Sequence, residues 1–374
     1  MLLKGVNVLD LSNLLPGPMC SLFLADLGAE VIKVESLSGD AMRYFEAKQK
    51  NTSPYFKALN RNKKSVALNL KAEEGKEIFM RLAKNADVVI EGFRPGKVEA
   101  LGISYKSLRK INPKIVYCSI TGYGQKGAYR NKAGHDLNYA ALSGLLDAIS
   151  AKPFVVGVQI ADVSGALVAV SAIVSSLLYR EKHGKGSYID IAVLDATLSV
   201  IGIHIAYRYV SGNTDTILSG SKPCYNVYKT KDGRFVSLGA IEKKFWLNFC
   251  NAIKRKDLVN KQFDGSRDAM NDMQAIFKSK TMNQWAELSN KHDFCCEPVK
   301  KISEIVKDKH FKSRRMLIEL EGAKQVAMPV AFSSRKKMTY SRCPNLGEHT
   351  KGILKKMGYN EKHVKELQAK GVIR

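Results

Sequence analysis

The fold is decided by VNVLDLSNLLPGPMCSLFLADLGAEVIKVE, residues 6–35. Its two ends, Val6–Leu11 and Glu30–Glu35, are rich in branched apolar residues and predict buried strands. Between them, Ser12–Pro18 predicts a loop, and Met19–Ala29 predicts an apolar-faced helix that begins just after two prolines. A strand, a helix and a second strand in this order indicate a parallel pair in an α/β sheet.

The same alternation continues along the chain. Further strands are predicted at 65–70, 87–93, 115–121 and 187–193, and helices at 72–85, 137–148, 162–182 and 194–211. Strongly apolar strands joined by helices predict a Rossmann-like parallel sheet that is covered on both faces. The Gly-x-Gly-x-x-Gly fingerprint is missing after the first strand, where Leu15–Pro18 stands instead, and this argues against a dinucleotide cofactor.

The composition changes after residue 222. Asn226–Thr230 and Arg234–Ala240 flank a Lys-Asp-Gly turn and predict a β-hairpin, which is followed by helical segments up to about residue 320. Gln325–Phe332 predicts a strand, and helices at 348–357 and 361–370 close the chain. We therefore expect a large domain from 1–190 and 325–374, a helical linker at 191–222, a smaller α+β domain at 223–310, and a return linker at 311–324.

The chain is strongly basic, with a formal net charge of +25. This charge suits a polyanionic partner such as nucleic acid, a membrane surface or a phosphate-rich small molecule. Because the lysines, Lys33 and Lys63 among them, are scattered and do not alternate with aromatic residues, we favour solvated lysines and a local phosphate site, with no nucleic-acid or membrane partner. A basic surface binder remains the non-enzymatic alternative, and it predicts steeply salt-dependent retention on DNA or anionic lipid.

Cysteine usage and hydropathy indicate a cytoplasmic protein. The seven cysteines form no C-x-x-C pair and predict reduced thiols, and no metal-ligand spacing occurs among the cysteines and histidines. Val163–Tyr179 is uncharged, but it is short for a bilayer and rich in Ala, Ser and Gly, so it predicts a buried core helix.

Three polar residues stand beside small residues and are candidates for chemistry: His135 after Gly134, Asp162 after Ala161, and Glu242 after Gly239–Ile241. One imidazole and two carboxylates suit a site that removes a proton from one face of a carbon atom and returns it on the other. Structural roles compete with this interpretation. Asp162 is a possible N-cap of the helix that follows, and Glu242 is a possible first-turn carboxylate.

Several motifs, in a fixed order over essentially the whole chain, resemble the class III CoA-transferase and α-methylacyl-CoA racemase group. The matching segments are 9–18, 24–35, 60–65, 91–96, 121–125, 133–136, 184–186 and 346–350. The resemblance implies an interlocked homodimer in which each active site lies between the large domain of one subunit and the small domain of the other.

The resemblance also implies an activity on acyl-CoA that needs no cofactor. Racemases of this group are similar to the chain at Gly134-His135-Asp136 and at Gly239–Glu242, which favours a 2-methylacyl-CoA racemase acting by 1,1-proton transfer. His135, assisted across the interface by Glu242, would then serve one face of the α-carbon, and Asp162 the other. The alternative is a CoA-transferase with Asp162 as its nucleophile, since the transferases of the group use an aspartate at this position.

CoA-binding residues follow from the same resemblance. They are Ala67, Leu68, Asn69, Leu70, Lys71, Gly92, Arg94, Gly134, Asp136, Leu137, Asn138 and Tyr139, with the backbone N–H of Asp136 as a candidate oxyanion donor at a helix start. Racemases commonly have basic residues where this chain has Ser36 and Ala100, and Lys33 or Lys97 is a candidate replacement. Candidates for the acyl pocket are Leu15, Met19, Phe23 and Tyr139.

Overall fold

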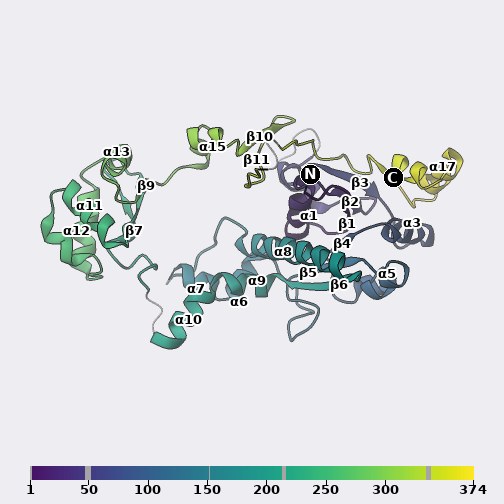
Figure 1. Ribbon diagram of the computed structural model, residues 1–374, viewed down its shortest axis with the longest axis horizontal. Helices are drawn as coiled ribbons and strands as arrows, with labels where there is room; N and C mark the ends of the chain where they lie inside the picture. Colours follow the sequence, from purple (N-terminus) through teal and green to yellow (C-terminus); the bar gives the residue numbers. More distant parts are fainter. Residues whose placement is uncertain (1, 47–51, 151, 213–215, 334–337) are drawn as a thin grey trace. The chain divides into compact units, whose positions relative to one another are not determined.

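Six parallel strands form the sheet of the larger part of the chain. The computed structural model describes residues 2–46, 52–150, 152–212, 216–333 and 338–374. The strands are β1 (Asn7–Asp10), β2 (Glu30–Glu35), β3 (Lys63–Ala67), β4 (Val88–Glu91), β5 (Val116–Thr121) and β6 (Ser187–Ala192), in the order β3-β2-β1-β4-β5-β6 (Figure 1). The predicted α/β class is confirmed. Because the connections run in opposite directions from β1, the carboxyl ends of β1 and β4 mark the switch point where open parallel sheets bind ligands.

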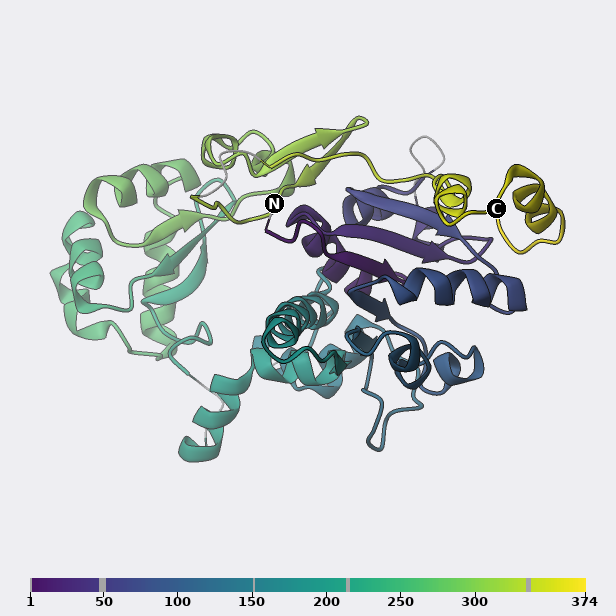
Figure 2. The ribbon, with the colours of Figure 1, turned by 45° about the vertical axis from the view of Figure 1, so that its right-hand side comes forward.

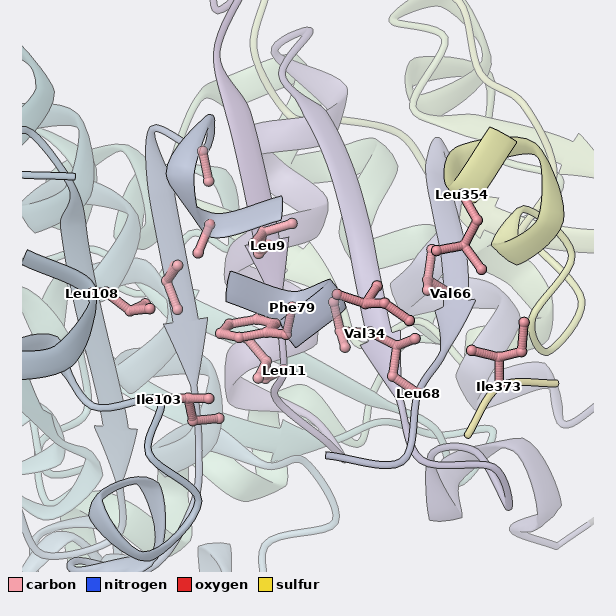
Figure 3. Close-up of a cluster of buried hydrophobic side chains, with 14 of the residues drawn as sticks. Leu9, Leu11, Val34, Val66, Leu68, Phe79, Ile103, Leu108, Leu354 and Ile373 are labelled. Atoms are coloured by element: carbon pink, nitrogen blue, oxygen red, sulfur yellow. The ribbon is translucent and has the colours of Figure 1, made fainter. Parts of the chain in front are cut away.

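Helices cover both faces of this sheet. On one face lie α1 (Pro16–Asp26), α6 (Asp136–Leu142) and α8 (Ile160–His183); on the other lie α3 (Glu73–Lys84), α5 (Tyr105–Ile111), α16 (Thr350–Lys356) and α17 (Glu361–Ala369). Successive strand residues point to opposite faces, so Val8 packs with the first group and Leu9 with the second. The last residues of the chain complete the hydrophobic core between the sheet and the second group of helices. Leu354 and Ile373 lie there beside Val66 and Leu68 (Figure 3). Figure 2 shows α16 next to the β3 edge of the sheet.

Helix α8 buries one face and exposes the other. Small and branched residues on its inner face pack against the sheet and α1, whereas Leu167 and Leu178 are 48% and 59% exposed. The helix is long and apolar enough to cross a membrane, with a mean hydropathy of 1.9, and so is the bent pair α9 (Val193–Val200) and α10 (Gly202–Ser211) taken together. The predicted core helix is thus correct for the inner face only, because outer residues such as Leu167 and Leu178 are not packed against the sheet.

A separate unit contains residues 146–154 and 201–313. Its antiparallel sheet joins β7 (Tyr225–Lys229), β8 (Phe235–Gly239) and β9 (Cys296–Pro298), and the predicted hairpin is present as β7–β8. Its helices are α11 (Lys243–Ala252), η2 (Lys256–Lys261), α12 (Arg267–Phe277), α13 (Met282–His292), α14 (Ile302–Ile305) and α15 (Lys309–Ser313). Trp246, Phe249, Phe277 and Trp285 are fully buried and form its core, a large apolar area for a unit of this size.

Two long helices of the sequence prediction are each broken in the structure. The helix expected at 137–148 is divided into α6 and α7 (Leu145–Ile149) at Gly144, whose φ of +82° ends the first helix. The helix expected at 194–211 is divided into α9 and α10 at Ile201. Helix α9 belongs with the large sheet and not with a linker, because the larger unit includes Val155–Val200.

The segment expected as a return linker contains a hairpin. Strands β10 (Leu317–Leu320) and β11 (Ala323–Val326) pair antiparallel around Glu321 and Gly322, whose positive φ angles form a tight turn. The strand expected at 325–332 therefore ends at Val326, and the larger unit begins again at Arg314. The remaining short helices of this unit are η1 (Ala41–Tyr44), α2 (Pro54–Asn60) and α4 (Lys97–Ala100).

Candidate active site

A cavity of about 460 Å³ opens where β1, β4 and β5 end. The loops that follow these strands line it with Asn13, Phe93 and Tyr123, among other residues, and α8 contributes Asp162 from its first turn. All of its lining residues belong to the larger unit. The cavity therefore occupies the switch point that the strand order defines.

His135 lines this cavity from the start of α6. Its backbone is held at several atoms: the N–H donates to Asn138 Oδ1 at 3.0 Å, and the carbonyl accepts the N–H groups of Asn138 and Tyr139. The imidazole is exposed in the single chain. The helix start thus fixes the direction in which His135 leaves the backbone, and His135 lines the cavity.

Asp162 lines the same cavity, so the structure brings His135 and Asp162 to one site. The N-cap of α8 is Gln159, which overturns the alternative in which Asp162 caps this helix. Instead, the N–H of Asp162 donates to Asp136 Oδ1 at 3.0 Å. Burial, and after it the negative charge of Asp136, raise the pKa of Asp162 to about 7. At neutral pH this carboxyl group is therefore present both with and without its proton.

Three tyrosine rings support the wall that carries His135. The Tyr123 ring packs edge-on against Tyr139 and Tyr129, with ring centroids 5.2 and 5.9 Å away, and Tyr139 donates to the Gly134 carbonyl at 2.6 Å. A Cβ at position 134 would lie 2.6 Å from the Tyr123 hydroxyl, so glycine is required for this packing. The small residue before His135 thus lets the rings approach the backbone.

A buried ionic cluster holds the loop after β1. Lys33 Nζ lies 3.0 Å from Asp40 and donates to the Ser12 carbonyl at 2.8 Å, while Lys63 Nζ lies 3.2 Å from Asp10. All four side chains are fully buried. Burial alone would raise the pKa of Asp10, but Lys33 and Lys63 lower it to about 2, so this carboxylate stays charged.

Glu91 holds the loop after β4 in a comparable way. Its side chain accepts the Phe93 N–H at 2.7 Å and a hydrogen bond from Ser119, and burial raises its pKa to about 7. The carboxyl group is fully buried and lies behind the cavity wall. Its contacts assign it a positioning role at this strand end.

Two features of the cavity were not predicted from sequence. Arg130 and Lys132, in the loop between β5 and α6, line it together with the predicted Arg94. The hydroxyl of Thr121 is buried in the wall and has no hydrogen-bond partner among the described residues. A buried donor without a partner, beside cations, suits a ligand with anionic oxygen atoms.

Residues 3–350 match the model of CoA-transferase family III. The chain belongs to this family. Alpha-methylacyl-CoA racemase from Homo sapiens is 31% identical over 100% of this chain and 98% of its own length. Succinyl-CoA:glutarate CoA-transferase from Homo sapiens is 33% identical over 99% and 90%. A CAIB/BAIF family protein from Brucella suis has a similar crystal structure, with a TM-score of 0.84 and 30% identity over 95% and 99%.

The other expected residues of the family site lie in different surroundings. Gly92, Arg94, Gly134, Asn138 and Tyr139 line the cavity, whereas residues 67–71, Asp136 and Leu137 do not. The N–H groups of Ala67, Leu68 and Asn69 donate to Thr350, Glu35 and Val372. The fold already uses these three N–H groups, so they are not free donors for CoA, and CoA binding by residues 67–71 stays a prediction.

Glu242 belongs to the smaller unit and is not among the lining residues of the cavity. It is the N-cap residue of α11, so it does not lie in the first turn, and its exposed side chain makes no capping hydrogen bond. A carboxylate at this position that does not cap its helix is available for another partner.

The departures from the family pattern are resolved in part. Ser36 and Ala100 are both exposed, and so is Lys97. Lys33 cannot replace a phosphate-binding residue, because its ammonium is fully buried and paired with Asp40. Of the apolar candidates, Tyr139 lines the cavity, whereas Leu15, Met19 and Phe23 do not.

Proposed function

We propose that this family member is an isomerase that inverts the α-carbon of 2-methylacyl-CoA thioesters. The observation that carries the proposal is the shared cavity of His135 and Asp162, an imidazole and a carboxyl group whose pKa is about 7. Two proton-transfer groups at one cavity are what a two-base reaction needs. The 31% identity to the human racemase over the whole chain adds support.

In the proposed reaction one base removes the α-proton, and the electron pair of the C–H bond moves onto the thioester oxygen. The opposite group then donates a proton to the other face of the same carbon, and the carbonyl is restored. Asp136 does not itself line the cavity but directly follows His135, which does. Its N–H has no hydrogen-bond partner among the described residues and is our candidate donor to the enolate oxygen. No cofactor takes part, because the acidity comes from the thioester.

In this proposal, Glu242 of a second subunit lies beside His135 and assists its proton transfer. The exposed apolar face of α8, together with Ile203 and Val210 of α10, which are 67% and 88% exposed, supports a homodimer. We assign both to contacts with the second chain.

Replacing His135 with alanine is expected to reduce α-proton exchange by about 10²- to 10⁴-fold, since a positioned acid or base contributes that much. The measurement is deuterium incorporation from heavy water into one enantiomer of 2-methylpentanoyl-CoA. A control is His363→Ala, which alters a histidine of α17. Turnover that survives intact in His135→Ala would exclude the assigned role, and a folded wild-type protein that incorporates no deuterium would exclude the racemase.

The pH profile of exchange tests the carboxyl pair. Below pH 7, the reaction that uses Asp162 as its base should slow about tenfold per pH unit, because protonation removes the base. Replacing Asp136 with asparagine keeps an oxygen that can accept the Asp162 N–H but removes a negative charge. We expect the midpoint to move to lower pH, with exchange at pH 6 rising about 2- to 5-fold. If the midpoint of the pH profile does not move, the pH dependence of exchange does not arise from the interaction of Asp136 with Asp162.

A second function is favoured by one specific observation, the position of the Asp162 carboxyl in the cavity. In a CoA-transferase this carboxylate would attack the thioester carbonyl and displace the CoA thiolate, which gives a mixed anhydride of the acyl group and the aspartate. The thiolate would then attack the aspartyl carbonyl, forming an aspartyl-CoA thioester and releasing the acyl group as a carboxylate. The 33% identity to the human succinyl-CoA:glutarate CoA-transferase supports this candidate. Hydroxylamine converts such an activated aspartyl carbonyl to a hydroxamate, so inactivation that requires both acyl-CoA and hydroxylamine would select the transferase, whereas a racemase would be unaffected.

A further inference from the structure

Glu91 is a buried carboxyl group that no cation neutralises. Its side chain is 1% exposed, and it forms no ion pair among the residues that the structure describes. The titratable groups around it supply no positive charge, since Glu99 of α4 and Asp190 of β6 are acids, and Tyr117 and Cys118 of β5 hold their protons. The charged form of Glu91 is therefore stabilised by hydrogen bonds and not by an ion pair.

The first carboxyl oxygen ends a chain of donors that begins at the protein surface. Ser119 of β5 donates to Glu91 Oε1, and the hydroxyl of Tyr188, on the edge strand β6, donates to Ser119 Oγ at 3.2 Å. The Tyr188 ring is 43% exposed, whereas Ser119 is buried. Because each donor polarises the next, this chain stabilises the carboxylate more than a single hydroxyl would.

The second carboxyl oxygen holds the loop after β4. Glu91 Oε2 accepts the N–H of Phe93 at 2.7 Å, and both Phe93 and Arg94 line the cavity. A hydrogen bond to a charged group is about twice as strong as one between neutral groups. Protonation of Glu91 would weaken the bond from Phe93 and reverse the bond to Ser119, because a protonated carboxyl group donates. Its pKa of about 7 places this change near neutral pH.

We infer that Glu91 is a positioning residue whose carboxylate form fixes Phe93 and Arg94 for ligand binding, and that Ser119 and Tyr188 set the pH range in which it does so. Glu91 does not line the cavity, so it acts on a ligand only through the loop. The inference rests on the proposed function for its ligand, an acyl-CoA. It does not depend on the reaction, since a racemase and a transferase would use the same loop.

Solvation of the carboxylate would act in the opposite direction. If opening of the loop let water reach Glu91, ionisation would favour the open loop, because burial disfavours the charge. The packing of the sheet argues against this. Glu91 shares a strand face with Val89, which belongs to the same core as Tyr117 and Ile103, and this core does not involve the loop's bond from Phe93. The two effects predict opposite signs, so an experiment separates them.

Hydrogen exchange tests the loop without a ligand. The Phe93 amide is followed by mass spectrometry of overlapping peptides at pH 6 and pH 8, and each rate is divided by that of the unprotected amide at the same pH. In the wild type we expect about fivefold higher protection at pH 8, where the acceptor is charged. In Glu91→Gln, whose side-chain amide accepts from Phe93 and donates to Ser119, protection should be low and equal at both pH values.

Glu99→Gln is the matched control for this comparison. It changes an exposed carboxylate whose side chain accepts no hydrogen bond among the described residues, so the fivefold difference should remain. Equal protection of the wild-type Phe93 amide at both pH values would overturn the inference. Higher protection at pH 6 would also overturn it, because solvation of Glu91 would then control the loop.

Tyr188→Phe tests the chain of donors and removes only a hydroxyl from an exposed ring. The midpoint of the change in protection should move to higher pH, so that protection at pH 7 falls about twofold. Tyr105→Phe is its control, because that ring lies 5.3 Å from the Tyr188 ring and its hydroxyl has no hydrogen-bond partner in the described chain. An unchanged midpoint in Tyr188→Phe would overturn the role of the chain.

Calorimetry connects the loop to ligand binding. The protein is titrated with 2-methylpentanoyl-CoA in an Asp162→Asn background, in which neither isomerisation nor transfer proceeds and the cavity carboxyl does not titrate. We expect Kd to be about 3- to 5-fold higher at pH 6 than at pH 8, and this difference to disappear when Glu91→Gln is added. Comparing the two proteins cancels any titration of CoA itself.

The outcomes separate the loop from the reaction. A pH dependence of Kd that is the same with and without Glu91→Gln would overturn the role of Glu91 in ligand binding. No binding at either pH would refute acyl-CoA as the ligand, and the exchange of the Phe93 amide would then decide the role of Glu91. If the expected pattern is found but the wild type does not exchange the α-proton, the inference stands and the racemase is refuted.

Discussion

Replacing Asp162 with asparagine is expected to reduce α-proton exchange by at least about 10³-fold, because an amide neither accepts nor donates the transferred proton. The same change is expected to raise the free energy of unfolding above pH 7. Burial and the charge of Asp136 raise the pKa of Asp162 from 3.8 to about 7, so the folded protein holds this proton more tightly than the unfolded chain. Activity and stability therefore move in opposite directions.

The sign of the stability effect follows from the raised pKa. The protonated carboxyl stabilises the fold fully below pH 3.8, and this contribution is lost as the pH rises through about 7. Asparagine carries no charge at any pH, so at pH 8 the variant should be more stable by on the order of 1–2 kcal/mol, after a discount for partial exposure. Urea denaturation of the wild type and of Asp162→Asn, at pH 5 and at pH 8, measures the free energy of unfolding of each protein. A variant that is less stable than the wild type at pH 8 would show that the carboxylate is not strained by its surroundings.

The large sheet was predictable because its strands are short apolar runs between turn signals. Glu30–Glu35 occurs with the predicted bounds, and β1, β4 and β5 lie within the predicted ranges. The hairpin at 317–326 was missed, since its four-residue strands are only partly buried and show no clear alternation. Helices α9 and α10 were merged because Ile201 and Gly202 interrupt the helix without a proline.

The two groups at the centre of the candidate site were predicted from the resemblance to a known family, because local pattern alone favoured structural roles for them. His135 and Asp162 each follow small residues, but so does Glu242, which does not line the cavity. Arg130 and Lys132 resemble solvated loop cations, and only the packing of Tyr129 on Tyr123 places their loop at the cavity. Which residues line a cavity depends on tertiary contacts, and these cannot be read from the spacing of residues along the sequence.

Lys33 shows most clearly what sequence could not reveal. Read along the chain, it is one of many lysines expected in water, and a candidate for CoA phosphates. In the structure its ammonium is fully buried between Asp40 and the Ser12 carbonyl, which belong to loops on either side of β2. The Leu14 N–H donates to the same Asp40 at 3.3 Å, so this ion pair fixes part of the cavity wall.

Replacing Lys33 with methionine should therefore lower the free energy of unfolding by about 3–5 kcal/mol, because it leaves Asp40 charged and buried without its partner. Lys64→Met is the matched control on the neighbouring strand, where an exposed pair with Glu30 contributes at most about 1 kcal/mol. In Lys33→Met/Asp40→Asn the uncompensated charge is gone, while an oxygen remains to accept the Leu14 and Met42 N–H groups.

The double variant should regain part of the loss, and urea denaturation of all three proteins measures the difference. Equal costs for Lys33→Met and Lys64→Met would mean that water reaches the cluster. If the double variant were less stable than Lys33→Met, the stability lost in Lys33→Met would come from altered packing and not from the buried, unpaired carboxylate of Asp40. Because the cluster holds the loop after β1, a higher KM for acyl-CoA should accompany the loss of stability in Lys33→Met.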